Sequence, residues 1–525
     1  MKSFKYIIPA AILTGMFLSS CVKDLDVTPL TTTTVTSATA WDSDTSADCI
    51  VAKIYSTFAI PGQSGPGNDG VDIVGADQGE ASFTRSYWNL EELTTDEAKV
   101  AWSDEALNGL QYCNWGPANR FIMLNYDRLY ITIAYCNEFL NQTTDNKLSV
   151  SDSRLKEIHT LRAEVRTLRA LSYYILLNFY GNVPFTDENS GIGAYLPEQK
   201  DRSFLFSWVE TELKSVIDSN ELPTKSAANY GTVNKYVAEM ILANLYMNAE
   251  VYNQGSHYDE AASVLEDIID NGGYSLEGNY AYNFQADNNL SPEIIFPIVY
   301  DGIYAQSYGG TLYLTAGAYD ADMNPGADLG IAGSWDGIRA PQDLSQIFET
   351  GDSRAMFFKT DREQVIADNN NFKQGWSVVK YTNLKRDGSK ASSADFPDTD
   401  FPFYRLSDAY LLYVEASLRG SGDKAKAVGL YNQIQERAFG DKSHNIGSLS
   451  EITLDELLDE RSRELYWEGH RRTDLIRFGK YLTKSWAFKG GNANGISSID
   501  SKYLLFPLPS TDVSANSNLK QNEGF

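Results

Sequence analysis

Apolar residues recur at helical spacing in several long stretches of the chain. In residues 157–181, EIHTLRAEVRTLRALSYYILLNFYG, they return every three or four positions, and charged residues take the other faces. The apolar positions are Leu161, Val165, Leu168, Leu171, Ile175 and Phe179, and the charged ones are Arg162, Glu164, Arg166 and Arg169. Gly181 supplies a stop, because glycine readily adopts the left-handed backbone at a helix end. The pattern predicts one long helix.

Two further stretches each predict a pair of helices joined by a short turn that contains glycine. Residues 233–274 form the first pair and residues 406–438 the second. Small residues stand where the helices could approach closely, at Ala238, Ala243, Ala249, Ala261, Ala416, Ala425 and Ala427. This texture is typical of tetratricopeptide (TPR) repeats, whose pairs bury their apolar faces by stacking on neighbours. Helices at 157–180 and near 120–141 are candidate neighbours, although an ordinary helical bundle would give the same pattern.

Elsewhere the pattern is irregular. Residues 61–119 and 275–400 are rich in residues such as Gly, Asn, Asp and Tyr, and short apolar runs at 293–301 and 376–382 suit isolated strands. The chain is therefore predicted to be mostly α, with TPR-like helix pairs forming a superhelical scaffold for a large irregular, loop-rich face with a few short strands. Long irregular segments inside a compact protein usually carry function, so a site is expected there.

The N-terminus has the pattern of an export signal. Lys2 and Lys5 precede an apolar run that is too short to span a bilayer and that ends at Leu18-Ser19-Ser20-Cys21. This is the pattern of a bacterial lipobox, whose cysteine is lipidated; a plain secretory signal with an incidental cysteine is the alternative. We expect a lipoprotein signal peptide at 1–20, a lipidated tether at 21–40 and a single domain at 41–525. Acyl chains such as palmitate on Cys21 would anchor the chain without a spanning helix.

Composition excludes several classes of function. The 525 residues carry 44 Lys+Arg and 70 Asp+Glu, a formal net charge of −26 that loss of Lys2 and Lys5 makes more negative. Nucleic-acid binding needs a basic face and is disfavoured. Cys49, Cys113 and Cys136 make no disulfide framework, although one pair could bridge in an oxidising compartment. Four scattered histidines give no zinc signature.

Catalytic motifs such as G-x-S-x-G or H-E-x-x-H are absent from the sequence. Neighbouring carboxylates such as Asp77/Glu80 and Asp104/Glu105 are expected by chance in so acidic a chain. A charged helix predicted at 454–481 offers opposite charges at Arg461, Glu464, Glu468, Arg471, Asp474 and Arg477. Fold-stabilising ion pairs around a turn at Gly469 are favoured there over an active-site cluster. The chain is predicted not to be an enzyme, with a glycoside hydrolase as the alternative.

Aromatic residues in the irregular segments favour carbohydrate binding. They are Trp88, Trp102, Trp115, Tyr300, Tyr304, Tyr308, Tyr313, Tyr319 and Trp335. The C–H face of a sugar can lie on an indole or phenol ring while Asp, Asn and Arg bind its hydroxyls. Two or three such rings in an arc would select a curved glycan. For each ring the alternative is a place in the core.

Several stretches together resemble the SusD/RagB family of Bacteroidetes outer-membrane glycan-binding lipoproteins. They are the lipobox with the acidic residues after it and residues 162–185, 396–419, 460–481 and 503–525. The resemblance implies an α-helical fold of four TPR units with an irregular face, anchored by lipid on the outside of the outer membrane. It also implies a SusC-like TonB-dependent transporter as partner, to which captured glycan is passed without any reaction.

Residues 75–102 look particularly like the starch-binding founding member of that family. The likeness implies that Trp102, Tyr308 and Trp335 form an aromatic arc for helical α-glucan, with Asp77 and Arg85 as hydrogen-bonding partners. The chain departs from that member at Val100, which replaces an additional tryptophan, and at Glu105, which replaces an amide ligand.

The resemblance also implies a calcium site with Asp398, Asp400, Asp287 and Asn289 as oxygen ligands, a donor set that suits calcium. The whole sequence thus predicts a surface lipoprotein that captures starch-like α-glucan or maltooligosaccharide for uptake. A family member that binds a different, for example β-linked, glycan is the alternative.

Overall fold

The computed structural model of the protein describes residues 45–63, 65–66, 70–190 and 195–525. The chain divides into two units, Met1–Cys49 and Ile50–Phe525. Of the first unit only residues 45–49 are described, and they contain the start of α2 (Ser46–Ala59). The predicted signal peptide, the tether with Cys21 and the domain boundary at residue 41 lie outside the described residues.

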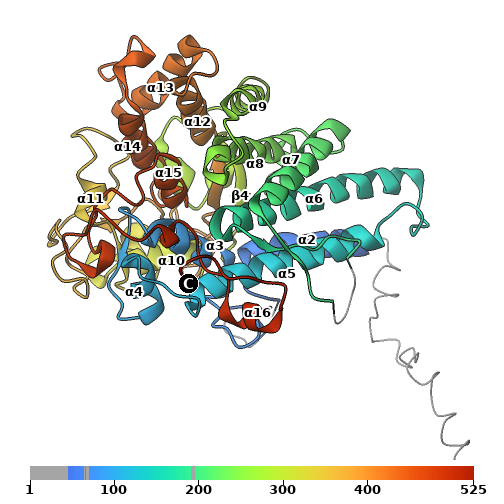
Figure 1. Ribbon diagram of the computed structural model, residues 1–525. Coiled ribbons are helices and arrows are strands. Elements are labelled where there is room, and N and C mark those ends of the chain that lie inside the picture. The colour runs from blue at the N-terminus through green and yellow to red at the C-terminus, as the bar shows by residue number, and fades with distance from the viewer. Residues whose placement is uncertain (1–44, 64, 67–69, 191–194) are drawn as a thin grey trace, which may run out of the picture. The chain divides into compact units, whose positions relative to one another are not determined.

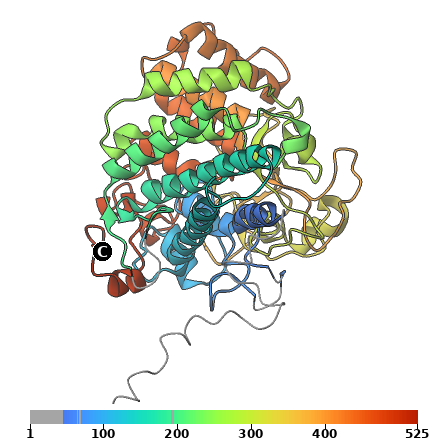
Figure 2. The same ribbon diagram turned by 90° about the vertical axis from the view of Figure 1, so that its right-hand side faces the viewer.

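Helices stacked in series form the scaffold of the second unit (Figure 1). They are α5 (Arg120–Gln142), α6 (Asp152–Tyr180), α7 (Arg202–Ser219), α8 (Lys235–Met247), α9 (Tyr258–Asn271), α12 (Leu406–Leu418) and α13 (Lys424–Phe439). Each helix packs on the next in this order, so that they form successive rows in Figure 2. The pairs α8/α9 and α12/α13 are the two pairs that the sequence predicts. The mostly α, TPR-like fold is confirmed.

The long helix predicted at 157–181 is α6, and it begins earlier, at Asp152. Gly181 ends it with a φ of 78°, as expected for a glycine stop. The charged residues of this helix are less exposed than the pattern indicates, because Glu164 and Arg169 are only 7% and 2% exposed. The Arg169 guanidinium pairs with Glu188 at 2.5 Å and with Glu212 at 2.9 Å. Neighbouring elements therefore cover the second half of α6 on its charged side as well.

The irregular face contains short helices and strands. The other described helices of the unit are α3 (Phe83–Trp88), α4 (Glu105–Gln111), α10 (Thr311–Thr315), α11 (Gln342–Ser345), α14 (Leu454–Leu465), α15 (Arg471–Arg477) and α16 (Ser510–Ala515), with π-helices η1 (Asn89–Leu93) and η8 (Pro325–Leu329). Single 3-10 turns are η2 (Ala227–Asn229), η3 (Ala249–Tyr252), η4 (Tyr280–Phe284), η5 (Asn288–Leu290), η6 (Ala316–Ala318), η7 (Ala321–Met323), η9 (Leu449–Glu451), η10 (Lys489–Gly491) and η11 (Ser501–Leu504). The helices α3 and α4 lie within 61–119, where the sequence predicts only irregular chain.

The strands are short and pair antiparallel in twos. The pairs are β1 (Lys99–Val100) with β5 (Ile338–Arg339), β2 (Val183–Pro184) with β3 (Gln199–Lys200), β4 (Ile294–Ile298) with β8 (Phe401–Arg405), and β6 (Phe357–Phe358) with β7 (Ser377–Val378). β4 and β7 fall in the two apolar runs that the sequence predicts as strands. The pairs β1/β5 and β4/β8 join segments distant in the sequence.

The charged stretch 454–481 is two helices rather than one. The chain leaves α14 and turns through Trp467 and Gly469, whose φ angles are 64° and 80°, before α15 begins. The charges of this stretch mostly pair with other segments. Glu464 contacts Arg354, Arg405 and Arg437, and these guanidinium groups hold its pKa well below the usual range although burial opposes them. The ion pairs therefore join α14 and α15 to the rest of the fold, whereas the favoured interpretation expected them between charges three or four apart within the stretch.

Among the described residues no helix is both long and apolar enough to cross a bilayer. Cys49 is exposed, Cys113 and Cys136 are buried, and all three are free thiols. The bridge that the sequence left open is therefore not formed between any two of them.

Candidate functional site

The pairing of β1 with β5 brings together two of the predicted arc residues. Val100 lies opposite Ile338, and the Ala101 amide donates to the Gly337 carbonyl at 2.8 Å. One residue further on, the Trp102 indole Nε1 donates to the main-chain carbonyl of Trp335 at 2.8 Å. Both indoles are half-buried, so that part of each ring faces solvent.

Gly337 lets the Trp102 indole lie against the β5 backbone. A Cβ at this position would be 2.3 Å from Cζ2 of Trp102, far inside van der Waals contact. The main chain beside it is fixed as well, because the amides of Trp335 and Gly337 donate to the carbonyls of Ala316 and Gly317 at 2.8 and 2.9 Å. Backbone contacts rather than side-chain packing thus set the position of this part of the arc.

Tyr308, Asp77 and Arg85 meet around Gly79. A Cβ on Gly79 would lie 3.0 Å from the Tyr308 Cβ and 3.3 Å from both Asp77 Oδ1 and Arg85 Nη1. Asp77 Oδ1 accepts the amides of Gly79 and Glu80 at 2.9 and 3.1 Å, which fixes the turn that carries it. The Tyr308 side chain is exposed, and one edge of its ring packs on Phe396 with the centroids 5.1 Å apart.

Arg85 connects this group to Trp102. Its guanidinium carbon is 4.6 Å from the Tyr313 ring centroid, 5.6 Å from that of Phe121 and 5.9 Å from that of Trp102. Such positions over ring faces stabilise the cation without using its N–H donors. Its buried Nε has no hydrogen-bond partner among the described residues. The structure thus brings all five predicted binding residues into one surface site.

Burial separates the arc from the other aromatic candidates. Five of them belong to the core, namely Trp88, Trp115, Tyr300, Tyr313 and Tyr319. Trp102, Trp335 and Tyr308 keep solvent-facing surface, and Tyr304 is 88% exposed. The core alternative therefore holds for five of the nine rings and for none of the three arc residues.

An ion-pair cluster that the sequence did not single out lies at the rim of the site. Arg120, the first residue of α5, donates Nε and Nη2 to the two carboxylate oxygens of Glu80 at 2.6 and 2.7 Å. Its Nη2 also donates to Asp104 Oδ2 at 2.6 Å. Glu80 follows Gly79, and Asp104 lies two residues after Trp102. Arg120 thus ties the Asp77–Arg85 segment to the Trp102 segment.

The surroundings of Asp104 in this cluster favour its charged form. Burial acts to raise the pKa of Asp104, but hydrogen bonds from Arg120 and from the Leu107 amide lower it below the ordinary value. Asp104 also caps α4 through that amide, at 3.0 Å. Glu80 and Asp104 belong to the carboxylate pairs that the sequence treats as chance neighbours. The observation that singles them out is their shared ion pairing with Arg120, which only the folded chain shows.

The two positions that depart from the starch-binding family member differ in exposure. Val100 is fully buried in β1 and presents no surface to a ligand. Glu105, the first residue of α4, is exposed next to Asp104. A carboxylate there offers only hydrogen-bond acceptors, whereas an amide would offer donors too.

The residues of the calcium prediction do not form one coordinating group. Asp398 accepts the amides of Gly302 and Ser392, and Asp400 accepts the Tyr300 amide and the Tyr230 hydroxyl. Asp287 accepts the Arg386 amide at 3.0 Å, and Asn289 is exposed. In the described part of the chain no group of three or more His, Cys, Asp or Glu could hold a metal ion. Asp398, Asp400 and Asp287 thus accept hydrogen bonds from the protein, and calcium binding by this set stays an untested prediction.

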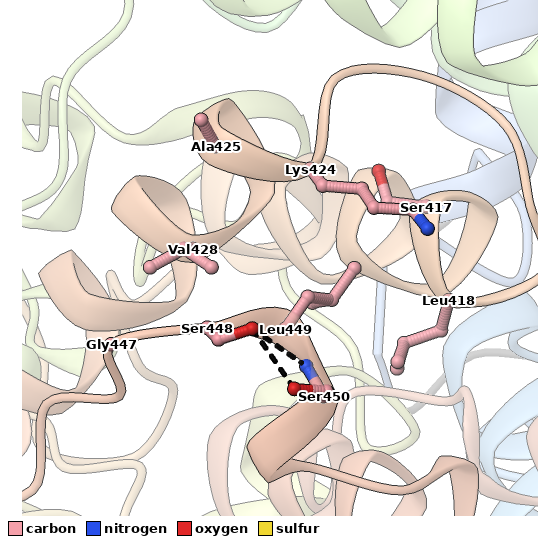
Figure 3. Close-up of a pocket in the computed structure, with 9 residues that line it drawn as sticks. All are labelled: Ser417, Leu418, Lys424, Ala425, Val428, Gly447, Ser448, Leu449 and Ser450. Atoms are coloured by element: carbon pink, nitrogen blue, oxygen red, sulfur yellow. Dashed lines mark hydrogen bonds between the residues drawn. The ribbon is translucent and has the colours of Figure 1, made fainter.

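Surface hollows elsewhere do not involve the arc. The pocket in Figure 3, of about 460 Å³, lies between the end of α12, the start of α13 and η9, with Lys424 at its edge. Ser448 Oγ, in its wall, is bonded to the Ser450 amide and hydroxyl. Lys424 is its one charged lining residue, and none of the predicted site residues lines it.

Comparison with known proteins gives consistent matches. Residues 353–525 match the model of the SusD family. The chain is 32% identical to the starch-binding protein SusD of Bacteroides thetaiotaomicron, over all of this chain and 99% of that protein. It is 24% identical to a SusD-like protein of Bacteroides ovatus, over 85% of this chain and 77% of that one.

Solved structures share the fold. Surface glycan-binding protein A of Bacteroides thetaiotaomicron, determined in complex with laminarihexaose, superposes with a TM-score of 0.70 at 21% identity, over 91% of this chain and 98% of that one. A SusD superfamily protein of Parabacteroides distasonis gives 0.71 at 20% identity, over 94% and 100%. At these identities the likeness concerns the fold.

Proposed function

This chain belongs to the SusD family, and from that premise we propose that it binds starch-like α-glucan or maltooligosaccharide on the arc of Trp102, Tyr308 and Trp335. SusD homologues are carbohydrate-binding proteins and not enzymes, so binding without reaction is the function to explain. The hydrolase alternative is set aside on that ground.

One observation carries the proposal. Trp102 and Trp335, far apart in the sequence, are joined by an indole-to-carbonyl hydrogen bond and keep part of their rings open to solvent. Two rigid aromatic faces held by backbone contacts form a preorganised platform, and preorganisation reduces the entropy lost on binding. Tyr308 adds a third ring, next to Asp77 and Arg85 at Gly79.

Hydrogen bonds with Asp77 and Arg85 would orient the sugar on the rings. Asp77 has an exposed carboxylate that accepts hydrogen bonds, and Arg85 has a guanidinium whose N–H groups donate them. A sugar hydroxyl both donates and accepts, so one glucose unit could bond to both groups while an adjacent unit lies on Tyr308. The relative that is named a starch-binding protein, at 32% identity over the whole chain, supports an α-glucan as this ligand.

A second candidate ligand is a β-linked glucan. The structural neighbour with laminarihexaose bound is the observation in its favour. That oligosaccharide is less tightly coiled than starch, so it would require the three rings to lie along a flatter line. The more similar relative in sequence is the starch binder, which favours the α-linked ligand.

The proposal extends to place and partner. We infer that lipidated Cys21 anchors the protein on the outer membrane, facing the exterior, and that a SusC-like TonB-dependent transporter receives the glycan. Metabolic labelling with a palmitate analogue in the native host tests the anchor, with Cys21→Ala as the control. Isolation of the tagged native protein with its membrane partners tests the transporter, and recovery without one contradicts that part.

Affinity electrophoresis tests the ligand. The chain from residue 22 onward is run through gels that contain amylose, pullulan, laminarin or no polysaccharide. We expect retardation by amylose and pullulan, and its loss in Trp102→Ala/Trp335→Ala. Tyr195→Ala is the matched control, because Tyr195 is exposed to a similar degree as Tyr308 but lies outside the arc. Retardation by laminarin alone would favour the second candidate, and unchanged retardation of the double variant would overturn the arc.

A further inference from the structure

A second hollow, which no residue of the arc lines, lies between α5, residues 184–186 and 196–197, and α16. Its volume is about 550 Å³, within the range of small-molecule sites. Its walls are mainly apolar and include Ile73, Ile131, Pro184, Leu196, Pro197 and Leu519. Two carboxylates also line it, Asp127 from α5 and Asp512 from α16. We name it the Asp127–Asp512 pocket.

Asp127 lacks a partner within the described structure. Its half-buried carboxylate makes no hydrogen bond or ion pair there, and Asp512 has only the hydroxyl of its neighbour Thr511, at 3.3 Å. Burial, and then the charge of Asp512, raise the pKa of Asp127 to about 6. Burial likewise raises the pKa of Asp512. The pocket therefore holds two carboxylates whose charges are not compensated.

The guanidinium group of the next residue, Arg128, donates its hydrogen bonds to groups other than the two carboxylates. Arg128 follows Asp127 in the sequence, but its Nη1 donates to Asp72 at 2.9 Å. Its Nη2 donates to the carbonyls of Pro61 and Ala81, at 2.9 and 2.7 Å. This contrasts with the rim of the arc, where Arg120 neutralises Glu80 and Asp104. The negative charge in the pocket is thus left for a ligand to neutralise.

A buried hydroxyl provides an independent sign of a ligand. Tyr126 lines the pocket, its side chain is 2% exposed, and its hydroxyl has no hydrogen-bond partner in the described structure. Burial raises the Tyr126 pKa, and the neighbouring Tyr130 hydroxyl, which donates to the Pro184 carbonyl at 2.6 Å, lowers it in part. The two hydroxyls do not meet the distance and angle of a hydrogen bond in the described structure. A buried polar atom without a partner is costly, which makes it a site where a ligand gains affinity.

We propose that the Asp127–Asp512 pocket binds a small organic cation, an ammonium or guanidinium group carried on a short apolar body. The charged group would lie between the two carboxylates, donate to them and to the Tyr126 oxygen, and relieve their mutual repulsion. The apolar body would cover the aliphatic walls, and the Tyr126 and Tyr130 rings, 4.6 Å apart, offer faces to the cation. A neutral sugar could donate hydrogen bonds but would leave the repulsion in place.

The proposal is independent of glucan binding at the arc. Cation binding can hold whether or not the arc takes α-glucan, because no residue of the arc lines the pocket. Helix α5 contributes to both sites. Its first residue, Arg120, lies at the rim of the arc, and Asp127, which lines the pocket, follows two turns later.

Calorimetric titration of the chain from residue 22 onward tests the proposal with three probes of one length, n-pentylamine, n-butylguanidine and 1-pentanol. We expect the two cations to bind and the alcohol to bind at least about tenfold more weakly, because only the cations carry a positive charge that pairs with the two carboxylates. Asp127→Asn/Asp512→Asn should weaken the cations by about tenfold or more. Asp395→Asn, an exposed carboxylate elsewhere, is the matched control and should change nothing.

The pH dependence of the wild-type chain provides a second readout that needs no variant. Cation affinity should fall as the pH is lowered through about 6, because Asp127 then takes up a proton. The groups that act on it are Asp512 from α16, which raises its pKa, and Arg128, whose charge lowers the pKa in part. The Tyr126 and Tyr130 hydroxyls stay protonated in this range. Equal affinity for pentylamine and pentanol, or cation binding unchanged in the double variant, would overturn the proposal. Loss of amylose retardation in that variant would assign the pocket to glycan instead.

Discussion

The indole Nε1 of Trp102 and the carbonyl oxygen of Trp335 are 2.8 Å apart, although 233 residues separate them in the chain. The bond fixes the plane of one ring of the arc against the main chain of the residue that carries the other. The bond uses the only polar group of the Trp102 side chain, the indole N–H. The ring can therefore contact a ligand only through its face and edge.

Trp102→Phe removes this bond and keeps an aromatic ring, whereas Trp102→Ala removes both. We expect about a tenfold or greater loss of amylose affinity in the alanine variant and a smaller loss in the phenylalanine variant, because aromatic anchors carry much of the energy of a binding surface. Affinity electrophoresis and calorimetry with maltoheptaose measure both. Equal loss in the two variants would mean that ring orientation, not ring area, is what binding requires.

Gly337→Ala tests the backbone contact beneath Trp102. A Cβ would lie 2.3 Å from the indole, so the ring must move from its place. We expect amylose affinity to fall although no ligand-facing group has changed. Gly333→Ala is the matched control, because a Cβ there meets nothing within 4 Å. Amylose affinity equal in the two variants would contradict the role of this contact, and thermal unfolding reports any general loss of stability.

Arg120→Lys tests whether the ion-pair cluster positions the two halves of the site. Lysine keeps the charge but cannot form the bidentate pair with Glu80. We expect amylose affinity to fall severalfold, while the free energy of unfolding changes by about 1 kcal/mol or less, because partly exposed ion pairs contribute little stability. A large fall in stability with unchanged affinity would make Arg120 purely structural.

The cluster also predicts an acid limit for binding. The pKa of Asp104 is lower in the folded chain than its ordinary value of 3.8, so the carboxylate stays charged there at neutral pH. The stabilising contribution is present above that value and is lost as the pH falls through the lowered pKa. Amylose affinity should therefore hold from pH 7 to about pH 5 and fall only in stronger acid. A decline centred near pH 6 would contradict this assignment.

Buried Glu164 predicts a pH dependence of stability with the opposite sign. Burial raises its pKa from 4.5 to about 7, although the Tyr55 hydroxyl, 2.5 Å from Oε2, lowers it in part. The folded chain then binds the proton more tightly than the unfolded chain, so this contribution is greatest below pH 4.5 and falls as the pH rises through about 7. Its full size is on the order of 3 kcal/mol.

Glu164→Gln removes that titration and keeps a group that can accept from Tyr55. Urea unfolding at pH 5 and pH 8 should show a smaller difference between the two pH values in this variant than in the wild-type chain. Glu157→Gln, on the same helix but exposed, is the control and should leave the difference unchanged. If the stability difference between pH 5 and pH 8 is the same in all three proteins, Glu164 is not the group that takes up the proton.

Local patterns in the sequence specified the scaffold. The spacing of apolar residues and Gly181 indicated α6, and the alanine-rich pairs indicated α8/α9 and α12/α13, because these signals act within a few turns of one helix. The turn at Gly469 was predicted, but 454–481 was still predicted as one helix, since its charged periodicity continues through the turn. The helices α3 and α4 are too short for a periodic signal to develop.

The residues of the arc were indicated by aromatic content and by resemblance, but the sequence alone could not say which rings are buried. That depended on the pairing of β1 with β5, a contact between two-residue strands that carries no local signal. The same holds for Arg120, whose two carboxylate partners come from different loops. The calcium prediction stays untested.

The chain by itself determined which segments become helices and which residue types could grip a sugar, because both depend on neighbours in sequence and on side-chain chemistry. Tertiary structure alone decided which rings keep an open face, which charges find a partner and which, like Asp127, do not. Those outcomes depend on contacts between distant segments, where burial sets the energy of every ring and every charge.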